Sequence, residues 1–249
     1  MQFIIQSNQP IAPSVYRMRL LGDTRGILRP GQFVQIALPG FYLRRPISVC
    51  DWIPAENGLL EIIYKTVGSG TAAMADLPVG ASVDTLTGLG NGYQLSVPES
   101  QSPLLAGGGV GIPPLYGLCK ALVANGQSPI VILGFNTANE AFLKEEFEAL
   151  GVSCVLCTAD GTAGVKGFVT DGMQDLSTSY DYVFTCGPEP MLKAVYALCD
   201  AKGIGGQFSF EERMACGFGV CMGCSCQTKY GSKRICKDGP VLCKEEILW

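Results

Sequence analysis

LLAGGGVGIPPLYGLCKALVAN, residues 104–125, has the pattern of a buried strand that turns through glycines into a helix. The apolar run PIVILGF at 129–135 follows as a second strand. Helix-like runs at 138–151 and 189–203 then alternate with further strand-like runs. Such alternation requires crossover connections, and it predicts a doubly wound parallel sheet covered by helices.

The residues on either side of this α/β region have different patterns. Residues 1–98 contain short β-like runs broken by Gly and Pro, such as FVQIAL at 33–38, which predict a small antiparallel barrel or sandwich. The polar stretch PESQSP at 98–103 has the composition of a linker. A cysteine-rich region begins at about residue 206. We therefore expect a multidomain β plus α/β protein divided into 1–98, 99–205 and 206–249.

Composition excludes several kinds of function. A formal net charge of -4 over 249 residues argues against nucleic acid or an anionic membrane surface as the partner. We see no export signal and no apolar stretch near the ~18 residues that a membrane span needs, so we expect a cytoplasmic protein. The chain has 12 cysteines and no histidine. Histidine-dependent triads, histidine-ligated zinc and Rieske clusters are therefore excluded.

The run MACGFGVCMGCSCQTKYGSKRIC, residues 214–236, contains five of the cysteines. Three are spaced C-x4-C-x2-C with a distant fourth, which is the plant-type ferredoxin pattern for a [2Fe–2S] cluster. Interspersed glycines allow the tight turns that let the thiolates converge. The predicted ligands are Cys216, Cys221, Cys224 and Cys236.

Two other interpretations of the cysteines remain open at this point. A zinc site usually pairs two C-x2-C knuckles, and only one such pair is present. The cysteines could also be purely structural. Cys226 and Cys243 do not fit the C-x4-C-x2-C spacing. Cys226 is close enough to Cys224 in sequence to keep the ligand assignment open. The other six cysteines lie in predicted strands and helices and are expected to be packing residues.

Two turns of the α/β region predict a dinucleotide site. The glycine turn in LLAGGGVGIPPL, residues 104–115, follows a strand and opens a helix, where backbone N–H groups and the helix dipole favour a phosphate. CGPEPM at 186–191 follows a later strand, and ligands in open α/β sheets bind at the carboxyl ends of strands. A sharp turn without a ligand is the alternative. The candidate residues are Gly107, Gly108, Gly109, Gly111, Gly187 and Pro188.

The first region contains two further elements suited to phosphate. Adjacent arginines open an apolar strand in YLRRPISVCDW at 42–52, and YKTVGSGTAAMADL at 64–77 has free N–H groups and hydroxyls before a short helix. Taken singly, each could be a surface charge or a helix N-cap. The candidate residues are Arg45, Pro46, Ser48, Tyr64, Gly68, Ser69, Gly70 and Thr71.

Together these motifs resemble the ferredoxin reductase superfamily. R-x-x-S at 45–48 resembles its flavin motif, in which the arginine contacts the FAD pyrophosphate, and VGSGT at 67–71 resembles its second flavin phosphate turn. LGNGY at 89–93 resembles a further flavin-domain loop. The glycine turn and TCGPEPM resemble its nicotinamide signatures. The resemblance implies FAD in the barrel, NAD in the α/β domain and Cys186 near the nicotinamide.

The order of the parts is similar to that in electron-transfer subunits of dihydroorotate dehydrogenase B, with EERMACGFGVCMGC and ICKDGPV as the most specific match. That resemblance implies pyrimidine biosynthesis and an FMN-containing catalytic partner subunit in a heterotetramer. Electrons would pass between that partner and NAD through the cluster and FAD, because a flavin exchanges both single electrons and hydrides. Alternatives are the same module in a transhydrogenase, sulfide dehydrogenase or sulfite reductase complex, or a zinc-binding interaction module.

The sequence favours NAD over NADP. A 2′-phosphate calls for a nearby arginine, and none occurs in GFNTANEA at 134–141 or CTADGTAG at 157–164. Asp160, which follows a predicted strand, would repel a phosphate.

Overall fold

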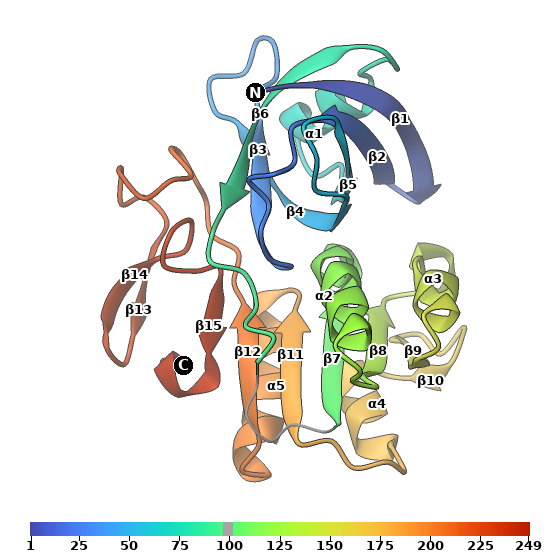
Figure 1. Cartoon of the computed structure of the whole chain (residues 1–249). Coiled ribbons are helices and arrows are strands. Elements are labelled where there is room, and N and C mark those ends of the chain that lie inside the picture. The colour runs from blue at the N-terminus through green and yellow to red at the C-terminus, as the bar shows by residue number, and fades with distance from the viewer. Residues whose placement is uncertain (97–101) are drawn as a thin grey trace.

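A computed structural model describes residues 1–96 and 102–249. Its N-terminal part is a closed antiparallel barrel with strand order β1-β2-β5-β4-β3-β6, drawn at the top of Figure 1. The barrel, and not the sandwich, is therefore the architecture of this region. Its elements are β1 (Gln2–Ala12), β2 (Val15–Gly22), β3 (Phe33–Ile36), β4 (Arg45–Trp52), β5 (Gly58–Lys65), the helix α1 (Ser69–Ala75) and β6 (Ser82–Leu89).

The second part is a seven-stranded sheet of order β10-β9-β8-β7-β11-β12-β15, parallel except for β15. The predicted parallel sheet with helices is confirmed. The strands are β7 (Pro103–Gly108), β8 (Ile130–Phe135), β9 (Ser153–Thr158), β10 (Val165–Lys166), β11 (Tyr182–Cys186), β12 (Gly205–Ser209) and β15 (Val241–Cys243). The helices are α2 (Ile112–Ala124), α3 (Lys144–Ala149), α4 (Val169–Asp175) and α5 (Glu189–Ala201). In Figure 1 the arrowheads of β11 and β12 point toward the barrel.

The prediction of a helix over 138–151 is wrong in its extent. The chain forms a short 3-10 turn at Ala138–Glu140, and α3 begins only at Lys144. Leu143, just before α3, has φ 66°, in the left-handed region that interrupts a right-handed helix. Its side chain is buried in the core, so tertiary packing stabilises the break.

The C-terminal region contributes to two sheets. A hairpin of β13 (Ser225–Thr228) and β14 (Gly231–Arg234) stands apart from the main sheet, whereas β15 pairs with β12. A short 3-10 turn, Lys244–Glu246, follows β15. The expected boundary between residues 205 and 206 falls at the start of β12, and the expected boundary between 98 and 99 lies outside the described residues, as does most of the predicted linker.

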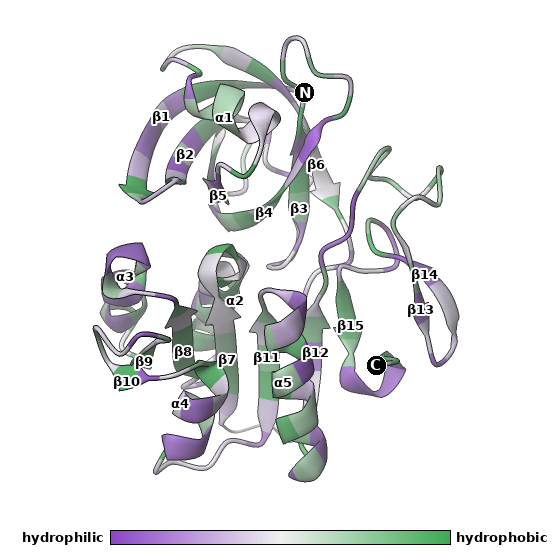
Figure 2. Ribbon diagram, turned by 180° about the vertical axis from the view of Figure 1, so that it is seen from behind, coloured by the Kyte–Doolittle hydropathy of each residue, from purple (hydrophilic) through white to green (hydrophobic). Residues whose placement is uncertain are grey.

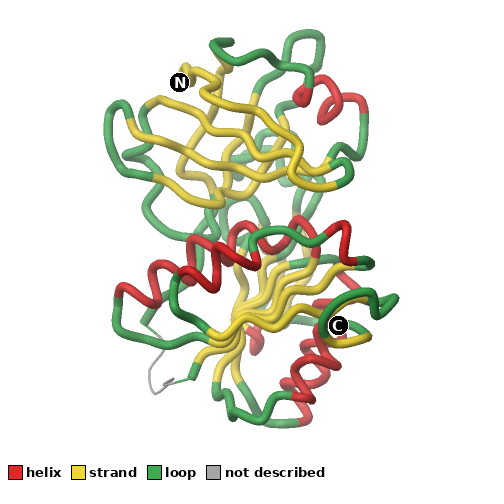
Figure 3. Tube along the Cα trace, turned by 90° about the vertical axis from the view of Figure 1, so that its right-hand side faces the viewer, coloured by secondary structure: helices red, strands yellow, loops and turns green. Residues whose placement is uncertain are grey.

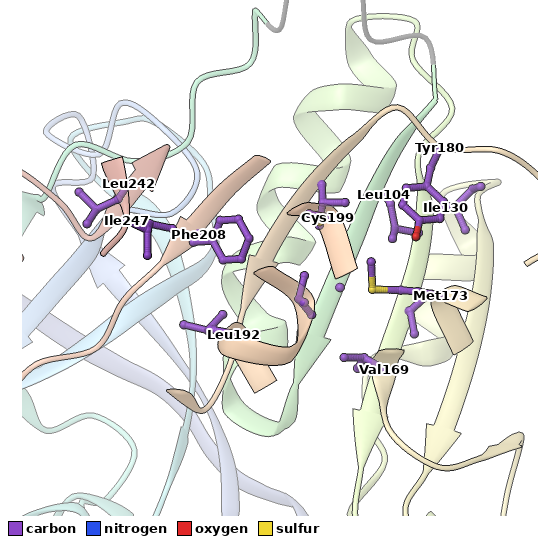
Figure 4. Packing of buried hydrophobic residues seen from close by; sticks show 14 of the residues in the cluster. Leu104, Ile130, Val169, Met173, Tyr180, Leu192, Cys199, Phe208, Leu242 and Ile247 are labelled. Atoms are coloured by element: carbon purple, nitrogen blue, oxygen red, sulfur yellow. The ribbon is translucent and has the colours of Figure 1, made fainter. Parts of the chain in front are cut away.

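Three groups of buried apolar side chains stabilise these parts. One lies inside the barrel, and the other two cover opposite faces of the parallel sheet. In Figure 2, β7 and β8 are mainly hydrophobic, whereas α5 shows both kinds of residue. Figure 4 shows side chains of α4 and α5 packed on the sheet beside C-terminal residues. Residues labelled there include Leu104, Ile130, Val169, Leu192, Phe208, Leu242 and Ile247.

Helix α2 lies between the barrel and the sheet, as Figure 3 shows. A Cβ added at Gly117 of α2 would lie 2.8 Å from the Cys50 carbonyl oxygen, so this glycine lets the helix approach β4 closely. Lys120 also pairs with Asp51 at 2.5 Å. The barrel is thereby fixed above the carboxyl ends of the parallel strands. Within the two described ranges, no helix combines the length and apolar content needed to cross a bilayer.

Candidate functional site

The four predicted cluster ligands lie in two contacting pairs. Cys216 contacts Cys221, and Cys224 contacts Cys236, in each case through a backbone N–H directed at the sulfur of the other residue. Cys221 N lies 3.4 Å from the Cys216 Sγ, and Cys236 N lies 3.4 Å from the Cys224 Sγ. A [2Fe–2S] cluster takes two thiolates on each iron, so two pairs supply its ligand set.

A single zinc ion needs its four ligands gathered around one point. Within residues 1–96 and 102–249, no three His, Cys, Asp or Glu side chains are gathered in that way. The C-x4-C-x2-C spacing, rather than the gathering of the side chains, therefore carries the assignment to a two-iron cluster. Cys226 lies on β13, packed against the core, and Cys243 ends β15.

The loop that carries Cys216, Cys221 and Cys224, called the cluster loop below, is held in shape by its backbone geometry and by one ion pair. Gly217 and Gly219 have φ values of 78° and 87°, which favour glycine. The Arg234 side chain donates to the Gly219 carbonyl at 2.8 Å and pairs with Asp238 at 2.8 Å. This ion pair lowers the pKa of Asp238 to about 2. The loop is thus tied to the hairpin that precedes Cys236.

The electrostatics of the loop differ between the two cysteine pairs. Burial acts to raise the pKa of the Cys216 thiol, but backbone N–H groups, that of Cys221 foremost, lower it to about 6. Burial raises the pKa of Cys236 to about 12, and the neighbouring Cys224 thiol adds to that rise. Iron binding to Cys224 and Cys236 therefore has to release protons, as thiolate ligation generally does.

The two phosphate-suited elements of the barrel lie together. Arg45, which begins β4, donates to the Leu43 carbonyl at 2.5 Å and places its guanidinium 4.9 Å from the centroid of the Phe41 ring. A Cβ added at Gly70, in the first turn of α1, would overlap that guanidinium. The arginine and the glycine turn, separate in sequence, thus form one cationic surface that suits a pyrophosphate.

The other candidates of the barrel differ in accessibility. Pro46 and Ser48 are half-buried on β4, and Ser69 begins α1. The Thr71 hydroxyl accepts from the N–H groups of Val67 and Gly68, so it closes the turn itself. Tyr64 is 2% exposed in the barrel interior, and its hydroxyl donates to Asn8 at 2.8 Å. The structure does not bring Tyr64 to the surface that Arg45 shares with α1.

The two turns of the α/β domain pack directly against each other. Cys186 at the end of β11 pairs in register with Gly107 at the end of β7. A Cβ on Gly111 would overlap the Cys186 carbonyl, and a Cβ on Gly108 or Gly187 would overlap the Met191 side chain. Gly109 has φ 52°, and a Cβ added there would meet no atom within 4 Å, so it borders open space. Pro188 precedes α5, so both helices begin at this edge.

Cys186, which the resemblance places near the nicotinamide, is half-buried at the end of β11, and the pKa of its thiol is raised. Burial raises the pKa of its thiol to about 12, although a hydrogen bond with the Ser209 hydroxyl opposes the rise. The adjacent Thr185 carbonyl accepts from the Tyr93 hydroxyl at 3.1 Å, which joins the LGNGY loop to β11. A hydride transfer needs no thiolate here, because the cofactors supply the chemistry.

We predict that Gly111→Ala weakens NADH binding by roughly tenfold or more. The added methyl group overlaps a backbone carbonyl that cannot rotate away, and such overpacking costs on the order of 1–3 kcal/mol. The dependence of flavin reduction on NADH concentration measures the effect. Val110→Ala, in the same turn but partly exposed, is the matched control. Wild-type NADH affinity in Gly111→Ala would contradict the assignment of this turn.

Sequence reasoning missed one residue at this site. Gln35 on β3 is fully buried and lies against Gly217 of the cluster loop. Alternation along FVQIAL places it on the outer face of the strand, but no local pattern indicates a contact with a residue so distant in sequence.

The comparisons with known proteins agree with this geometry. Residues 211–248 match the family model "Iron-sulfur cluster binding domain of dihydroorotate dehydrogenase B", and residues 105–197 match "Oxidoreductase NAD-binding domain". A solved structure of an NADH-dependent reduced ferredoxin-NADP oxidoreductase superposes with a TM-score of 0.88 at 31% identity, covering 99% of this chain and 90% of that chain. Phthalate dioxygenase reductase, with a TM-score of 0.63 at 20% identity, covers 82% of this chain and 64% of that chain and shares the fold.

Curated relatives match along almost the whole length. A protein of Fusobacterium nucleatum and one of Bacillus pumilus are each 42% identical to this chain, and each alignment covers 98% of this chain and 96% of the relative. Both are named "Dihydroorotate dehydrogenase B (NAD(+)), electron transfer subunit". The chain therefore belongs to the family of dihydroorotate dehydrogenase B electron transfer subunits.

Proposed function

We propose that this chain carries electrons between a dihydroorotate-oxidising partner subunit and NAD in pyrimidine biosynthesis. Its cofactors are FAD, a [2Fe–2S] cluster and NAD, and it is an NAD-linked flavin and iron–sulfur oxidoreductase. The observation that carries the proposal is the position of β3 and of β4, the strand that carries the candidate flavin residues Arg45, Pro46 and Ser48. They adjoin the cluster loop through Gln35 and Gly217, and they adjoin α2 of the nicotinamide domain through Cys50 and Gly117.

Each of the three cofactors is assigned to its own part of the chain. We assign residues 1–98 to FAD binding, 99–205 to NAD binding and 206–249 to the cluster. Arg45 and the α1 turn would hold the flavin pyrophosphate, the glycines at 107–111 and the CGP turn the nicotinamide dinucleotide, and the two cysteine pairs the irons. When bound, the flavin supplies the exchange between hydride and single electrons. The protein's own contribution is to hold these groups in that order.

The partner is proposed to be an FMN-containing dihydroorotate dehydrogenase catalytic subunit, in a cytoplasmic heterotetramer. The surface beside the cluster supports a docked partner, because three apolar side chains of the loop are exposed. These are Phe218, Val220 and Met222, at 52%, 72% and 53%. Exposed apolar patches of this kind commonly mark protein interfaces.

A second function is favoured by one observation. The solved structure at 31% identity is an NADH-dependent reduced ferredoxin-NADP oxidoreductase, so the same module could serve another complex, such as a transhydrogenase. Sulfide dehydrogenase and sulfite reductase complexes are related possibilities.

Asp160 favours NAD over NADP, because a carboxylate repels the 2′-phosphate of NADP. The hydroxyl and the N–H of Thr162 donate hydrogen bonds to the Asp160 carboxylate, lower its pKa and keep it ionised.

Reconstitution tests the proposed function. The loaded chain is mixed with an FMN-containing dihydroorotate dehydrogenase catalytic subunit, and NADH formation from dihydroorotate and NAD is followed by absorbance. We expect NADH formation only with both chains present, and a complex with the mass of a heterotetramer. No complex and no coupled activity, with both cofactors bound, would contradict this partner and favour another complex.

A further inference from the structure

Gln35 is a buried polar side chain that has no hydrogen-bond partner in the part of the chain that the structure describes. It is 0% exposed, and neither its Nε2 nor its Oε1 atom bonds any group within the described ranges. Leaving a buried amide unsatisfied costs on the order of 1–3 kcal/mol. By contrast, the buried Gln32 accepts from the Leu28 N–H at 2.7 Å and donates to the Gly90 carbonyl at 2.9 Å. Gln35 is therefore the glutamine of this barrel that needs an external partner.

The position of Gln35 indicates where that partner lies. Its neighbours Val34 and Ile36 point into the barrel core, so Gln35 points outward. In the β3–β4 ladder it stands opposite Pro46, and Phe33 stands opposite Ser48. The outer face of β3 therefore adjoins the strand that we assign to the flavin.

The same amide also contacts the cluster loop. A Cβ added at Gly217 would overlap the Cδ, Nε2 and Oε1 atoms of Gln35, so the glycine α-carbon lies directly on the amide. Gly217 follows the cluster ligand Cys216. Phe33, two residues before Gln35, packs in the buried cluster that contains Cys224 and Cys236. Gln35 thus lies between the flavin strand and the iron–sulfur ligands.

We propose that the amide N–H of Gln35, which lies where the flavin strand meets the cluster loop, donates a hydrogen bond to an electron-rich acceptor atom of a bound redox cofactor. This inference rests on the proposed function. Flavin and cluster both present such acceptors, and both gain negative charge on reduction. A hydrogen-bond donor stabilises the reduced form and raises the reduction potential.

The test is a redox titration of the full chain loaded with FAD and cluster, followed by visible and electron paramagnetic resonance spectra. Gln35→Met keeps the length of the side chain and removes the donor. We expect the ratio of reduced to oxidised cofactor at a fixed potential to fall about tenfold for one centre, about 59 mV for one electron. Gln35→Leu is the second variant, and it is expected to shift the same centre in the same direction.

A matched control and a second background identify the acceptor. Gln32→Met removes a buried glutamine whose bonds lie within the barrel, and its potentials are expected to equal those of the wild type. Repeating the Gln35 change in a Cys221→Ser chain shows whether the shift persists without the cluster. Persistence assigns the acceptor to the flavin, and a shift confined to the cluster assigns it to the cluster; either supports the proposal.

Two results would overturn the inference. Wild-type potentials and spectra in both Gln35 variants, with both cofactors bound, would reduce Gln35 to a packing residue and leave the proposed function standing. A wild-type chain that takes up neither flavin nor cluster would remove the proposed function, and the inference with it.

Discussion

Cys221→Ser is expected to abolish the [2Fe–2S] absorbance while the flavin is still reduced by NADH. Cys221 contacts Cys216, and we propose that the two form half of the ligand set. A serine hydroxyl is a poor ligand for iron compared with a thiolate. The rate of electron delivery to or from a partner chain is expected to fall by more than roughly 100-fold. Loss of a group that merely hydrogen-bonds a metal ligand already lowers metal affinity or activity by about 10–100-fold. Reduction by NADH remains because the nicotinamide turns and β4 lie outside the loop.

The measurement is the visible spectrum and iron content of the purified variant, before and after NADH. Cys226→Ser is the matched control, because Cys226 lies only two residues beyond Cys224 but packs on β13. It is expected to retain the cluster. A Cys221→Ser chain that keeps its cluster would contradict the ligand assignment. Loss of both chromophores would mean that the flavin domain needs the loop for its structure.

Arg45→Leu is expected to weaken FAD binding by roughly 10–150-fold. A hydrogen bond to a charged group contributes about 1.5–3 kcal/mol, and the guanidinium is the cationic side chain placed over the α1 turn. The leucine also removes the contact with the Phe41 ring. Equilibrium titration of the flavin-free variant with FAD, read by flavin fluorescence, measures the affinity.

Arg44→Leu provides the control for this change. Arg44 is the preceding residue, but its guanidinium pairs with Asp84 of β6 and donates to the Asp84 carbonyl at 2.9 Å. Its loss is expected to lower barrel stability by about 0–1 kcal/mol and to leave FAD affinity unchanged. Equal FAD affinities in wild type and Arg45→Leu would move the pyrophosphate site away from β4.

Local patterns in the sequence were enough to predict several parts. The glycine turn in 104–115, the strand–helix alternation after it and the C-x4-C-x2-C spacing are each patterns of neighbouring residues. The structure contains the expected strands, the helices α2 and α5, and contacts between the cysteines in pairs. Sequence spacing alone left zinc open as an alternative to iron. The match of residues 211–248 to the iron–sulfur cluster binding family model is what distinguishes the two.

Other parts depended on contacts between distant residues. The break at Leu143 is stabilised by burial of its side chain, which no local periodicity reveals. The return of β15 to pair with β12 joins the cysteine-rich region to the parallel sheet across some thirty residues. The contact of Gln35 with Gly217 spans most of the chain, and it appears only after the barrel and the loop have folded against each other.

The anaerobic visible spectrum of the purified chain, before and after NADH, tests the central claim most directly. The account predicts flavin and iron–sulfur bands in the oxidised protein, and bleaching of both on addition of NADH, since electrons pass from the nicotinamide site through the flavin to the cluster. A protein that stays colourless after reconstitution with FAD, iron and sulfide, and that contains zinc instead, would contradict it.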